Sequence, residues 1–211
     1  MMKLKIIFIL FFISAAVRFV QGQTINDLFT KLPESFLPLD VSNRLNLISL
    51  YKADDKASVK NHFGDSCSIL RLTDDYIQVR TGKNTMELFL LPMINDSKVI
   101  GLIQTVCAPV CDSYLEFYTT AWKKLSTSVF ISFADKYDFL NDGLDLEEEK
   151  VKNALIPLDI SLMRLHYEPE KQEMYQYYTT PDYLSGDNRV KVTAYLKESP
   201  KQFKWNLTRF E

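Results

Sequence analysis

The chain has 211 residues, of which 46% are hydrophobic, and its 25 Lys and Arg against 27 Asp and Glu give a net charge of −2. This composition is typical of a globular protein, and the acidic balance disfavours nucleic acid as a partner, because non-specific binding needs clustered cations to neutralise phosphates. Anionic membrane surfaces are disfavoured for the same reason.

Residues 1–22 have the pattern of a secretory signal peptide. Lys3 and Lys5 precede the apolar run from Ile6 to Val17, and modest side chains occupy the positions that signal peptidase reads before Gln23. Cleavage there leaves 189 residues with 22 basic and 27 acidic side chains. We therefore expect a periplasmic or secreted protein.

The alternative is a retained membrane anchor. A spanning helix needs about 20 apolar residues, and Arg18 interrupts this run early. No later run is long enough to span a bilayer, so we expect no membrane insertion after signal cleavage.

Three cysteines, Cys67, Cys107 and Cys111, follow the leader. In an oxidising compartment two of them can pair within one chain, and the sequence does not decide which. Cys107 and Cys111 can face each other across a Pro-containing turn, and their spacing is one residue too long for a redox-active pair. We therefore expect a structural role.

The first half of the mature chain begins with helices. Thr24 and Asp27 form a capping pattern before a short amphipathic helix that carries Ile25, Leu28, Phe29 and Leu32. A second helix begins at Asp40 or Ser42 and directs four residues toward the core, and a third runs from Asp55 to about His62. The four expected core residues of the second helix are Val41, Leu45, Ile48 and Tyr51.

From Cys67 the hydrophobic period changes to two, which predicts a series of strands with short turns and hence antiparallel neighbours. The run from Lys98 to Cys107 is apolar on both faces, so it belongs in the middle of a covered sheet. The other predicted strands of this half are Ser68–Thr73, Tyr76–Thr81, Thr85–Leu91 and Ser113–Tyr118.

The second half repeats this order. After an irregular segment from Trp122 to Asp142, Asp145 and Glu148 form a capping pattern for a helix that ends near Leu155. Four further strands are predicted, over Asp159–Tyr167, Glu173–Thr180, Arg189–Leu196 and Gln202–Phe210.

The order of elements predicts an α+β fold, with antiparallel sheet and helices on one face. We expect a single domain over residues 23–211, and two related halves, 23–125 and 145–211, are one way to divide it. An inhibitor-like arrangement of two helix-plus-four-strand units is one concrete form of this prediction.

Ser66 lies in the tetrapeptide Phe63-Gly64-Asp65-Ser66, which resembles the nucleophile block of GDS-type esterases and lipases. A serine nucleophile needs a positioned histidine base. At the spacing where that family has Asp before its histidine, this chain has Met163 before His166. A plain turn between helix and strand is the favoured interpretation.

The segment from Asp138 to Glu149 matches a calcium loop at Asp138, Asp142, Gly143 and Glu149, but Leu140 occupies a position that needs an oxygen ligand. An acidic first helical turn explains these residues more simply. The histidines, His62 and His166, have no ligands at metal-site spacing. We expect no catalytic, metal or cofactor site.

Aromatic residues are dense in the last forty residues, where they can form a binding platform or the core of a small sheet. Because Phe203, Trp205 and Leu207 share one face, we assign Phe203 and Trp205 to the core. The remaining aromatic residues of this set are Tyr175, Tyr177, Tyr178, Tyr183 and Tyr195.

Several segments together resemble an uncharacterised secreted family, a domain of unknown function confined to Bacteroidales bacteria. The resemblance implies an address and a chain length, and it supplies no reaction and no catalytic residues. It rests on Leu32-Pro33-Glu34-Ser35-Phe36-Leu37-Pro38-Leu39 with Arg44, Leu72 to Tyr76, Leu90-Leu91-Pro92, Val106 to Pro109, Asp112-Ser113, Phe117-Tyr118, Trp122 and Lys204-Trp205-Asn206.

The functional prediction is an exported, non-enzymatic binding module whose partner is a protein or a glycan. It presents an exposed sheet face or the segment from Trp122 to Asp142. A periplasmic inhibitor or adaptor is the alternative from fold analogy, and a serine esterase that uses Ser66 is the alternative from chemistry.

Overall fold

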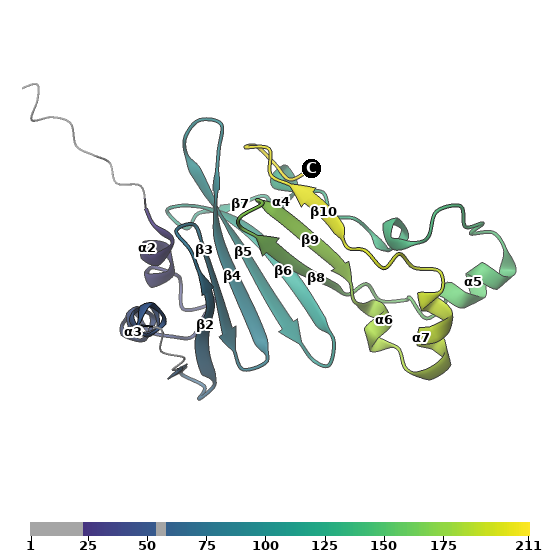
Figure 1. Cartoon of the computed structure of the whole chain (residues 1–211), viewed down its shortest axis with the longest axis horizontal. Helices are drawn as coiled ribbons and strands as arrows, with labels where there is room; N and C mark the ends of the chain where they lie inside the picture. Colours follow the sequence, from purple (N-terminus) through teal and green to yellow (C-terminus); the bar gives the residue numbers. More distant parts are fainter. Residues whose placement is uncertain (1–22, 54–57) are drawn as a thin grey trace, which may run out of the picture.

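The computed structural model describes residues 23–53 and 58–211. The predicted signal peptide, residues 1–22, and residues 55–57 of the third predicted helix lie outside the described residues. The described strands form two antiparallel sheets, and helices accompany both (Figure 1). The α+β prediction is therefore confirmed.

The larger sheet has seven strands that pair in chain order, β1 to β7, each antiparallel to the next. β5 pairs with β4 over Lys98–Thr105 and with β6 over Val99–Cys107, which confirms the prediction of a central, covered strand. The strands are β1 (Val59–Lys60), β2 (Ser66–Leu72), β3 (Tyr76–Thr81), β4 (Asn84–Pro92), β5 (Lys98–Cys107), β6 (Cys111–Thr119) and β7 (Lys124–Leu125).

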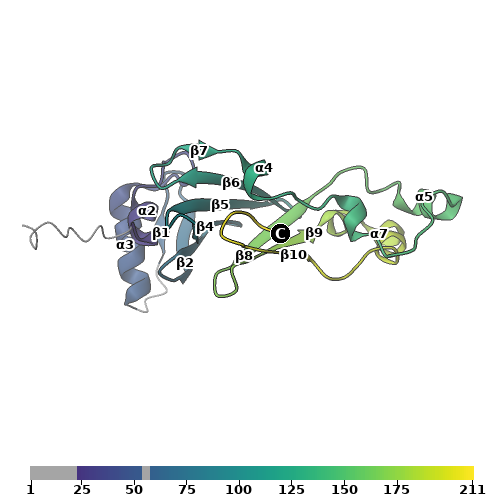
Figure 2. The same ribbon diagram turned by 90° about the horizontal axis from the view of Figure 1, so that it is seen from above.

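Two helices, α2 (Ile25–Thr30) and α3 (Val41–Lys52), cover one face of this sheet (Figure 2). Thr24 and Asp27 form the predicted capping box, in which each side chain accepts a hydrogen bond from the other residue's backbone N–H. The predicted apolar face of α2 is confirmed by the burial of Ile25, Leu28, Phe29 and Leu32.

The predicted core face of α3 is wrong at three of its four residues. Val41 and Leu45 are about half exposed, at 49% and 50%, and Tyr51 is 36% exposed. The residues that face the sheet are Arg44, Leu47 and Ile48. The Arg44 guanidinium is buried because it donates to the backbone carbonyls of three residues in and after α2, Thr30, Leu32 and Leu37.

The opposite face of the large sheet is covered by a three-stranded sheet, β8 (Met163–Glu168), β9 (Glu173–Tyr178) and β10 (Lys201–Lys204), in the order β10-β9-β8. The Phe89 ring of β4 stacks on Tyr167 of β8, with 4.1 Å between ring centroids. Gly101 of β5 leaves the space that the Phe89 ring occupies, because a Cβ at Gly101 would overlap that ring.

The remaining helices lie beside and beyond the small sheet, and α5, α6 and α7 form the end of the molecule farthest from α2 and α3 (Figures 1 and 2). They are α4 (Thr127–Phe130), the 3-10 helix η1 (Lys136–Phe139), α5 (Glu149–Leu155), α6 (Thr180–Tyr183) and α7 (Gly186–Thr193).

Two predicted elements are wrong. Within the third predicted helix, Val59 and Lys60 form β1, which pairs with Cys67 and Ser66 across a turn. The predicted strand over Arg189–Leu196 is instead helix α7, in which Thr193 donates to the Arg189 carbonyl four residues earlier. β-branched residues gave α7 its strand-like pattern, but strand preference depends on a neighbouring strand, and no strand of the described residues pairs with α7.

The last predicted strand is shorter than expected. β10 ends at Lys204 because the Asn206 side chain accepts hydrogen bonds from the backbone N–H groups of Thr208 and Arg209 and turns the chain back. The strands are divided seven and three between the sheets, rather than four and four. The predicted helix from Asp145 begins later, at Glu149, and ends at Leu155 as expected.

We predict that Leu47→Ala and Leu45→Ala differ sharply in stability. Leu47 is 1% exposed and Leu45 is 50% exposed on the same helix. Removing the buried side chain should lower the free energy of unfolding by about 2–5 kcal/mol. The exposed substitution should change it by less than about 1 kcal/mol.

Urea unfolding of the two variants, followed by circular dichroism, measures both changes. Equal destabilisation by the two substitutions would contradict the orientation of α3.

Candidate functional site

A groove with a volume of about 610 Å³ lies between η1 and α5. Its floor is aliphatic, and charged side chains stand at its rim. The lining residues are Lys136, Tyr137, Leu140, Leu146, Glu147, Lys152, Leu155, Ile156, Leu158 and Asp159.

One wall of the groove is built by η1. Asp135 caps this helix by accepting from the Tyr137 N–H at 2.7 Å, and Asp138 accepts in return from the Asp135 N–H at 2.9 Å. Phe139 is buried and stacks on Tyr178 of β9, with 5.5 Å between ring centroids. This anchor leaves the Tyr137 ring facing outward, 58% exposed.

The other wall is built by α5 and the residues that follow it. Val151 and Leu158 are buried and hold this segment to the rest of the protein, whereas Ile156 between them is 68% exposed. Lys136 joins the two walls, because its Nζ donates to the Leu158 carbonyl at 2.9 Å.

The charges at the rim are largely paired within the protein. The Lys152 Nζ lies 2.8 Å from a Glu147 carboxylate oxygen, and the Lys136 ammonium lies 5.4 Å from the Tyr137 ring centroid. Such a rim offers little net charge to a ligand. The chemistry that the groove presents is therefore mainly apolar.

The Ser66 hydroxyl is not hydrogen-bonded to a histidine within the described residues. It lies 3.3 Å from the Ser58 hydroxyl, His62 lies 4.0 Å from an Asp40 oxygen, and the ring of His166 is hydrogen-bonded to Glu87. Neither histidine makes a hydrogen bond to Ser66 within the described residues, so the pair of nucleophile and base that an esterase requires is not formed.

The calcium-like residues have separate partners. Asp138 caps η1, Asp142 forms an ion pair with Lys197 at 2.7 Å, and Glu149 begins α5. Over residues 23–53 and 58–211, no three His, Cys, Asp or Glu side chains are grouped to hold a metal ion. The acidic first turn predicted from the helix dipole is present at Glu149.

The aromatic residues of the C-terminal part belong mainly to the core. Trp205 is buried and its indole Nε1 donates to the Pro92 carbonyl at 2.7 Å, and Phe203 packs against the same cluster, so both assignments are confirmed. Leu207, which shares their sequence pattern, is 42% exposed. Its φ of +72° places it in the turn after β10.

The tyrosines of this part are dispersed and form no flat platform. Tyr177 lies under the Arg164 guanidinium at 4.0 Å, Tyr175 donates to Glu173 at 2.6 Å, and Tyr178 stacks on Phe139. Tyr183 is mostly exposed, and Tyr195 is half-buried.

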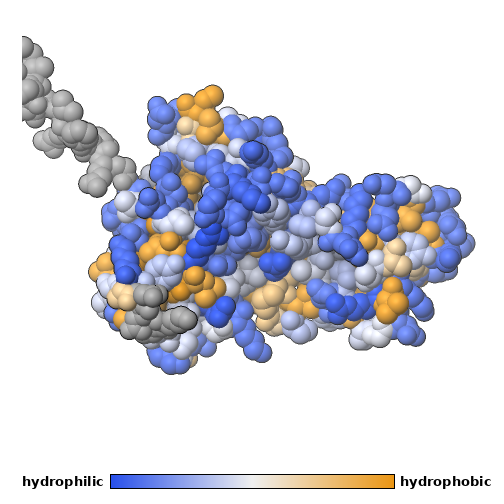
Figure 3. All heavy atoms as spheres, viewed as in Figure 1, coloured by the Kyte–Doolittle hydropathy of each residue, from blue (hydrophilic) through white to orange (hydrophobic). Residues whose placement is uncertain are grey.

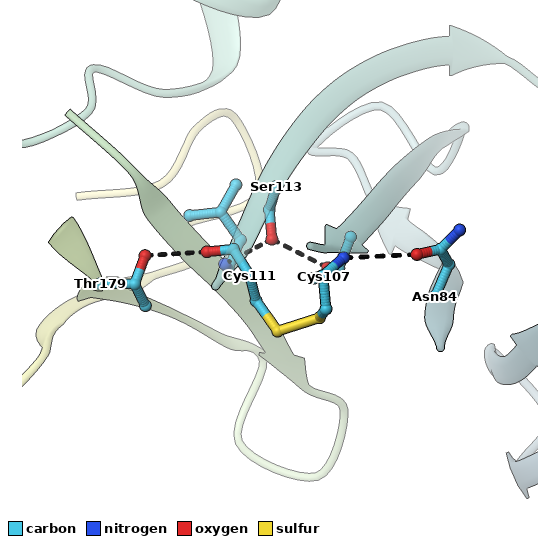
Figure 4. The surroundings of a disulfide bond; sticks show 7 residues. Asn84, Cys107, Cys111, Ser113 and Thr179 are labelled. Carbon is cyan, nitrogen blue, oxygen red and sulfur yellow. Dashed lines mark hydrogen bonds between the residues drawn. A yellow bond between two sulfur atoms is a disulfide. The ribbon is translucent and has the colours of Figure 1, made fainter. Parts of the chain in front are cut away.

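Cys107 and Cys111 form a disulfide that closes the hairpin between β5 and β6 (Figure 4). The Asn84 side chain accepts from the Cys107 N–H at 3.3 Å, and the Thr179 hydroxyl donates to the Cys111 carbonyl at 2.8 Å. The third cysteine, Cys67, is buried and free. The hairpin pairing was one of the combinations that the sequence left open.

The partly buried His166 and the buried Glu87 form a hydrogen-bonded pair of a kind that catalytic sites also use. Glu87 is 3% exposed, and its carboxylate accepts from the Tyr76 hydroxyl at 3.0 Å and the Tyr167 N–H at 3.0 Å and meets His166 Nδ1 at 3.2 Å. These contacts join β3, β4 and β8. The pair therefore holds the two sheets together.

The sequence pointed to one wall of the groove. Lys136, Tyr137 and Leu140 fall in the irregular segment named as a binding candidate, but Leu146 and Ile156 were missed. The signal that could have found them is a pair of large aliphatic residues just outside the short helix Glu149–Leu155. No helix within the described residues is long and apolar enough to cross a membrane.

We predict that His166→Gln reduces the dependence of stability on pH. The hydrogen bond to Glu87 raises the pKa of His166, an effect opposed by burial. A raised folded-state pKa stabilises fully below the unfolded value of about 6.5, and this stabilisation is lost as pH rises through the folded value. The melting temperature of the unsubstituted protein should therefore fall by about 2–4 °C between pH 6 and pH 8 through this group.

Thermal unfolding at both pH values measures the effect, with His62→Gln as the matched control. The control should keep the decrease that His166→Gln removes. An unchanged decrease in His166→Gln would contradict the role of this pair.

Comparison with known proteins places the whole chain in one family. The family model described as "Protein of unknown function (DUF3256)" matches residues 17–210. A solved structure titled "Structure of a domain of an uncharacterized protein from Porphyromonas gingivalis W83" is similar to the chain with a TM-score of 0.77 and 26% identity, covering 87% of this chain and 96% of that one. No curated protein matches. The chain belongs to this family of unknown function.

Proposed function

We propose that the protein is an exported, non-enzymatic binding module, and that the groove between η1 and α5 binds an apolar segment of a partner protein. The observation that carries this proposal is the exposure of large side chains at the groove. Ile156 is 68% exposed, Tyr137 is 58% exposed and Leu146 is 40% exposed. Side chains of this size in a shared concavity are typical of interaction surfaces.

The charge arrangement favours a protein segment over a small charged ligand. Lys152 and Glu147 neutralise each other, and Lys136 is engaged by the Leu158 carbonyl. Figure 3 shows hydrophobic residues interspersed with hydrophilic ones over the end of the molecule where α5, α6 and α7 lie. An apolar floor with a mixed polar rim is the composition of protein interfaces.

The non-enzymatic part of the proposal is supported by how the candidate catalytic residues are used. Ser66 is hydrogen-bonded to Ser58, and the carboxylate of Glu87 is occupied by Tyr76, His166 and Tyr167. The described lining of the groove includes no Ser, Cys, Thr or His side chain, and its Lys152 and Glu147 are paired with each other.

Export is supported by two independent features. The basic and then apolar leader has the pattern of a signal peptide, and Cys107 and Cys111 are close enough to pair. Disulfides persist in oxidising compartments such as the periplasm and the extracellular space. A periplasmic or secreted address accounts for both features.

We predict that protein recovered from its native cells begins at Gln23 and carries one disulfide. Intact-mass spectrometry before and after reduction measures both properties. The expected mass is that of residues 23–211, and reduction should add the mass of two hydrogens. An intact leader on protein recovered from the cytosol would contradict export.

We predict that Ile156→Glu weakens partner binding by about tenfold, because it places a charge among the apolar side chains that line the groove. Val190→Glu is the matched control, since Val190 is 74% exposed on α7 and does not line the groove. The partner is identified by affinity capture from the native cell envelope with mass spectrometry. Its affinity for each variant is then measured with purified proteins.

Retention of one protein by the unsubstituted chain and by Val190→Glu, but not by Ile156→Glu, is the expected result. If every captured protein binds all three chains equally, the groove is not the binding site and the proposal fails.

A further inference from the structure

A second hollow, which we call the hairpin cleft, lies at the end of the large sheet that carries the β3–β4 and β5–β6 turns. Its volume is about 240 Å³. Four segments meet there: the connection between α2 and α3, the turn before β2, the β3–β4 hairpin and the end of β5. The residues that carry the argument are Phe36, Asn61, Phe63, Asp65, Asn84 and Gln104.

An exposed aromatic side chain, that of Phe63, is among the lining residues of the hairpin cleft. Phe63 is 81% exposed, and its turn is fixed because the Asn61 side-chain oxygen accepts from the N–H groups of both Phe63 and Asp65 at 2.9 Å. The His62 N–H donates to the Pro38 carbonyl at 3.1 Å and ties this turn to the opposite wall. A ligand therefore meets a pre-formed aromatic surface.

Two side-chain amides line the hairpin cleft, and each uses only one of its two polar atoms within the described residues. Gln104 donates from Nε2 to the Phe36 carbonyl at 3.2 Å, and Asn84 accepts at Oδ1 from the Cys107 N–H at 3.3 Å. Within the described residues the Gln104 oxygen and the Asn84 nitrogen have no hydrogen-bond partner. One acceptor and one donor are therefore oriented by the protein and left for a ligand.

The charge of the cleft excludes an acidic ligand. Asp65 is the only charged side chain among its described lining residues, and none of them is Lys, Arg or His. A carboxylate beside two amides suits the hydroxyl groups of a neutral molecule, which can donate to the carboxylate and exchange hydrogen bonds with the amides. Phosphate, sulfate and carboxylate ligands would be repelled.

We propose that the hairpin cleft binds one ring of a neutral saccharide, with the face of that ring against Phe63 and its hydroxyls on Asn84, Gln104 and Asp65. The cleft is smaller than the roughly 300 Å³ at which small-molecule pockets begin, so it accommodates one unit of a longer chain. This inference is independent of the groove between η1 and α5, whose lining is mainly aliphatic.

The test is isothermal titration calorimetry of the purified protein with four neutral hexasaccharides: cellohexaose, maltohexaose, mannohexaose and chitohexaose. Heparin serves as the acidic comparison. At least one neutral hexasaccharide should bind, and heparin should not. Phe63→Ala should weaken that binding about tenfold, and Phe63→Trp should restore it, because stacking needs an aromatic face rather than phenylalanine itself.

Ile94→Ala is the matched control, since Ile94 is 75% exposed in the β4–β5 turn at the opposite end of the sheet. It should leave saccharide affinity unchanged. The proposal is overturned if none of the four saccharides binds, if Phe63→Ala binds as tightly as the unsubstituted protein, or if heparin binds at the same site. Because Ile156→Glu leaves this cleft intact, failure here and failure of the groove proposal are separate results.

Discussion

Three backbone N–H groups of β8 determine how the two sheets meet. The N–H groups of Met163, Leu165 and Tyr167 donate to side chains of the large sheet, namely Asp112 at 2.9 Å, Ser113 at 2.9 Å and Glu87 at 3.0 Å. The edge of a sheet carries a row of unpaired polar groups, and burying such groups without partners costs about 1–3 kcal/mol each. Every second backbone N–H group of β8 therefore donates to a side chain of the large sheet. The edge of the small sheet meets the large sheet without losing these hydrogen bonds.

The position of the proposed binding groove follows from this joint. β8 pairs with β9, and Tyr178 of β9 stacks on Phe139. This contact fixes η1, which forms one wall of the groove. Arg71 of β2 adds ion pairs to Glu168 and Glu170 at the turn after β8. The large sheet and its two helices therefore support the far end of the molecule, where we propose that a partner binds the exposed aliphatic side chains.

The helices and strands with regular patterns were predicted from the sequence, whereas the contacts that join distant segments were not. Alternation placed β3 and β5 at their observed bounds, and the capping pattern at Thr24 placed α2, because both signals depend on local geometry alone. The burial of Arg44 and Glu87 was not predicted, because a charged residue in a sequence pattern is expected to face solvent. The partners that stabilise these two side chains come from distant segments. The sequence also missed the hairpin cleft and one wall of the groove, because both are formed by segments that are distant in the chain. Ile156 and Phe63 look like core residues in sequence, and only the packing around them shows that they are exposed.

Amide hydrogen exchange at β8, measured residue by residue by NMR, tests the joint most directly. The account predicts that the N–H groups of Met163, Leu165 and Tyr167 exchange as slowly as those in the middle of β4 and β5, because each is hydrogen-bonded to a side chain of the large sheet. Exchange at these three positions as fast as in the exposed β3–β4 turn would show that β8 is an open edge. That result would contradict the arrangement of the two sheets described for this protein.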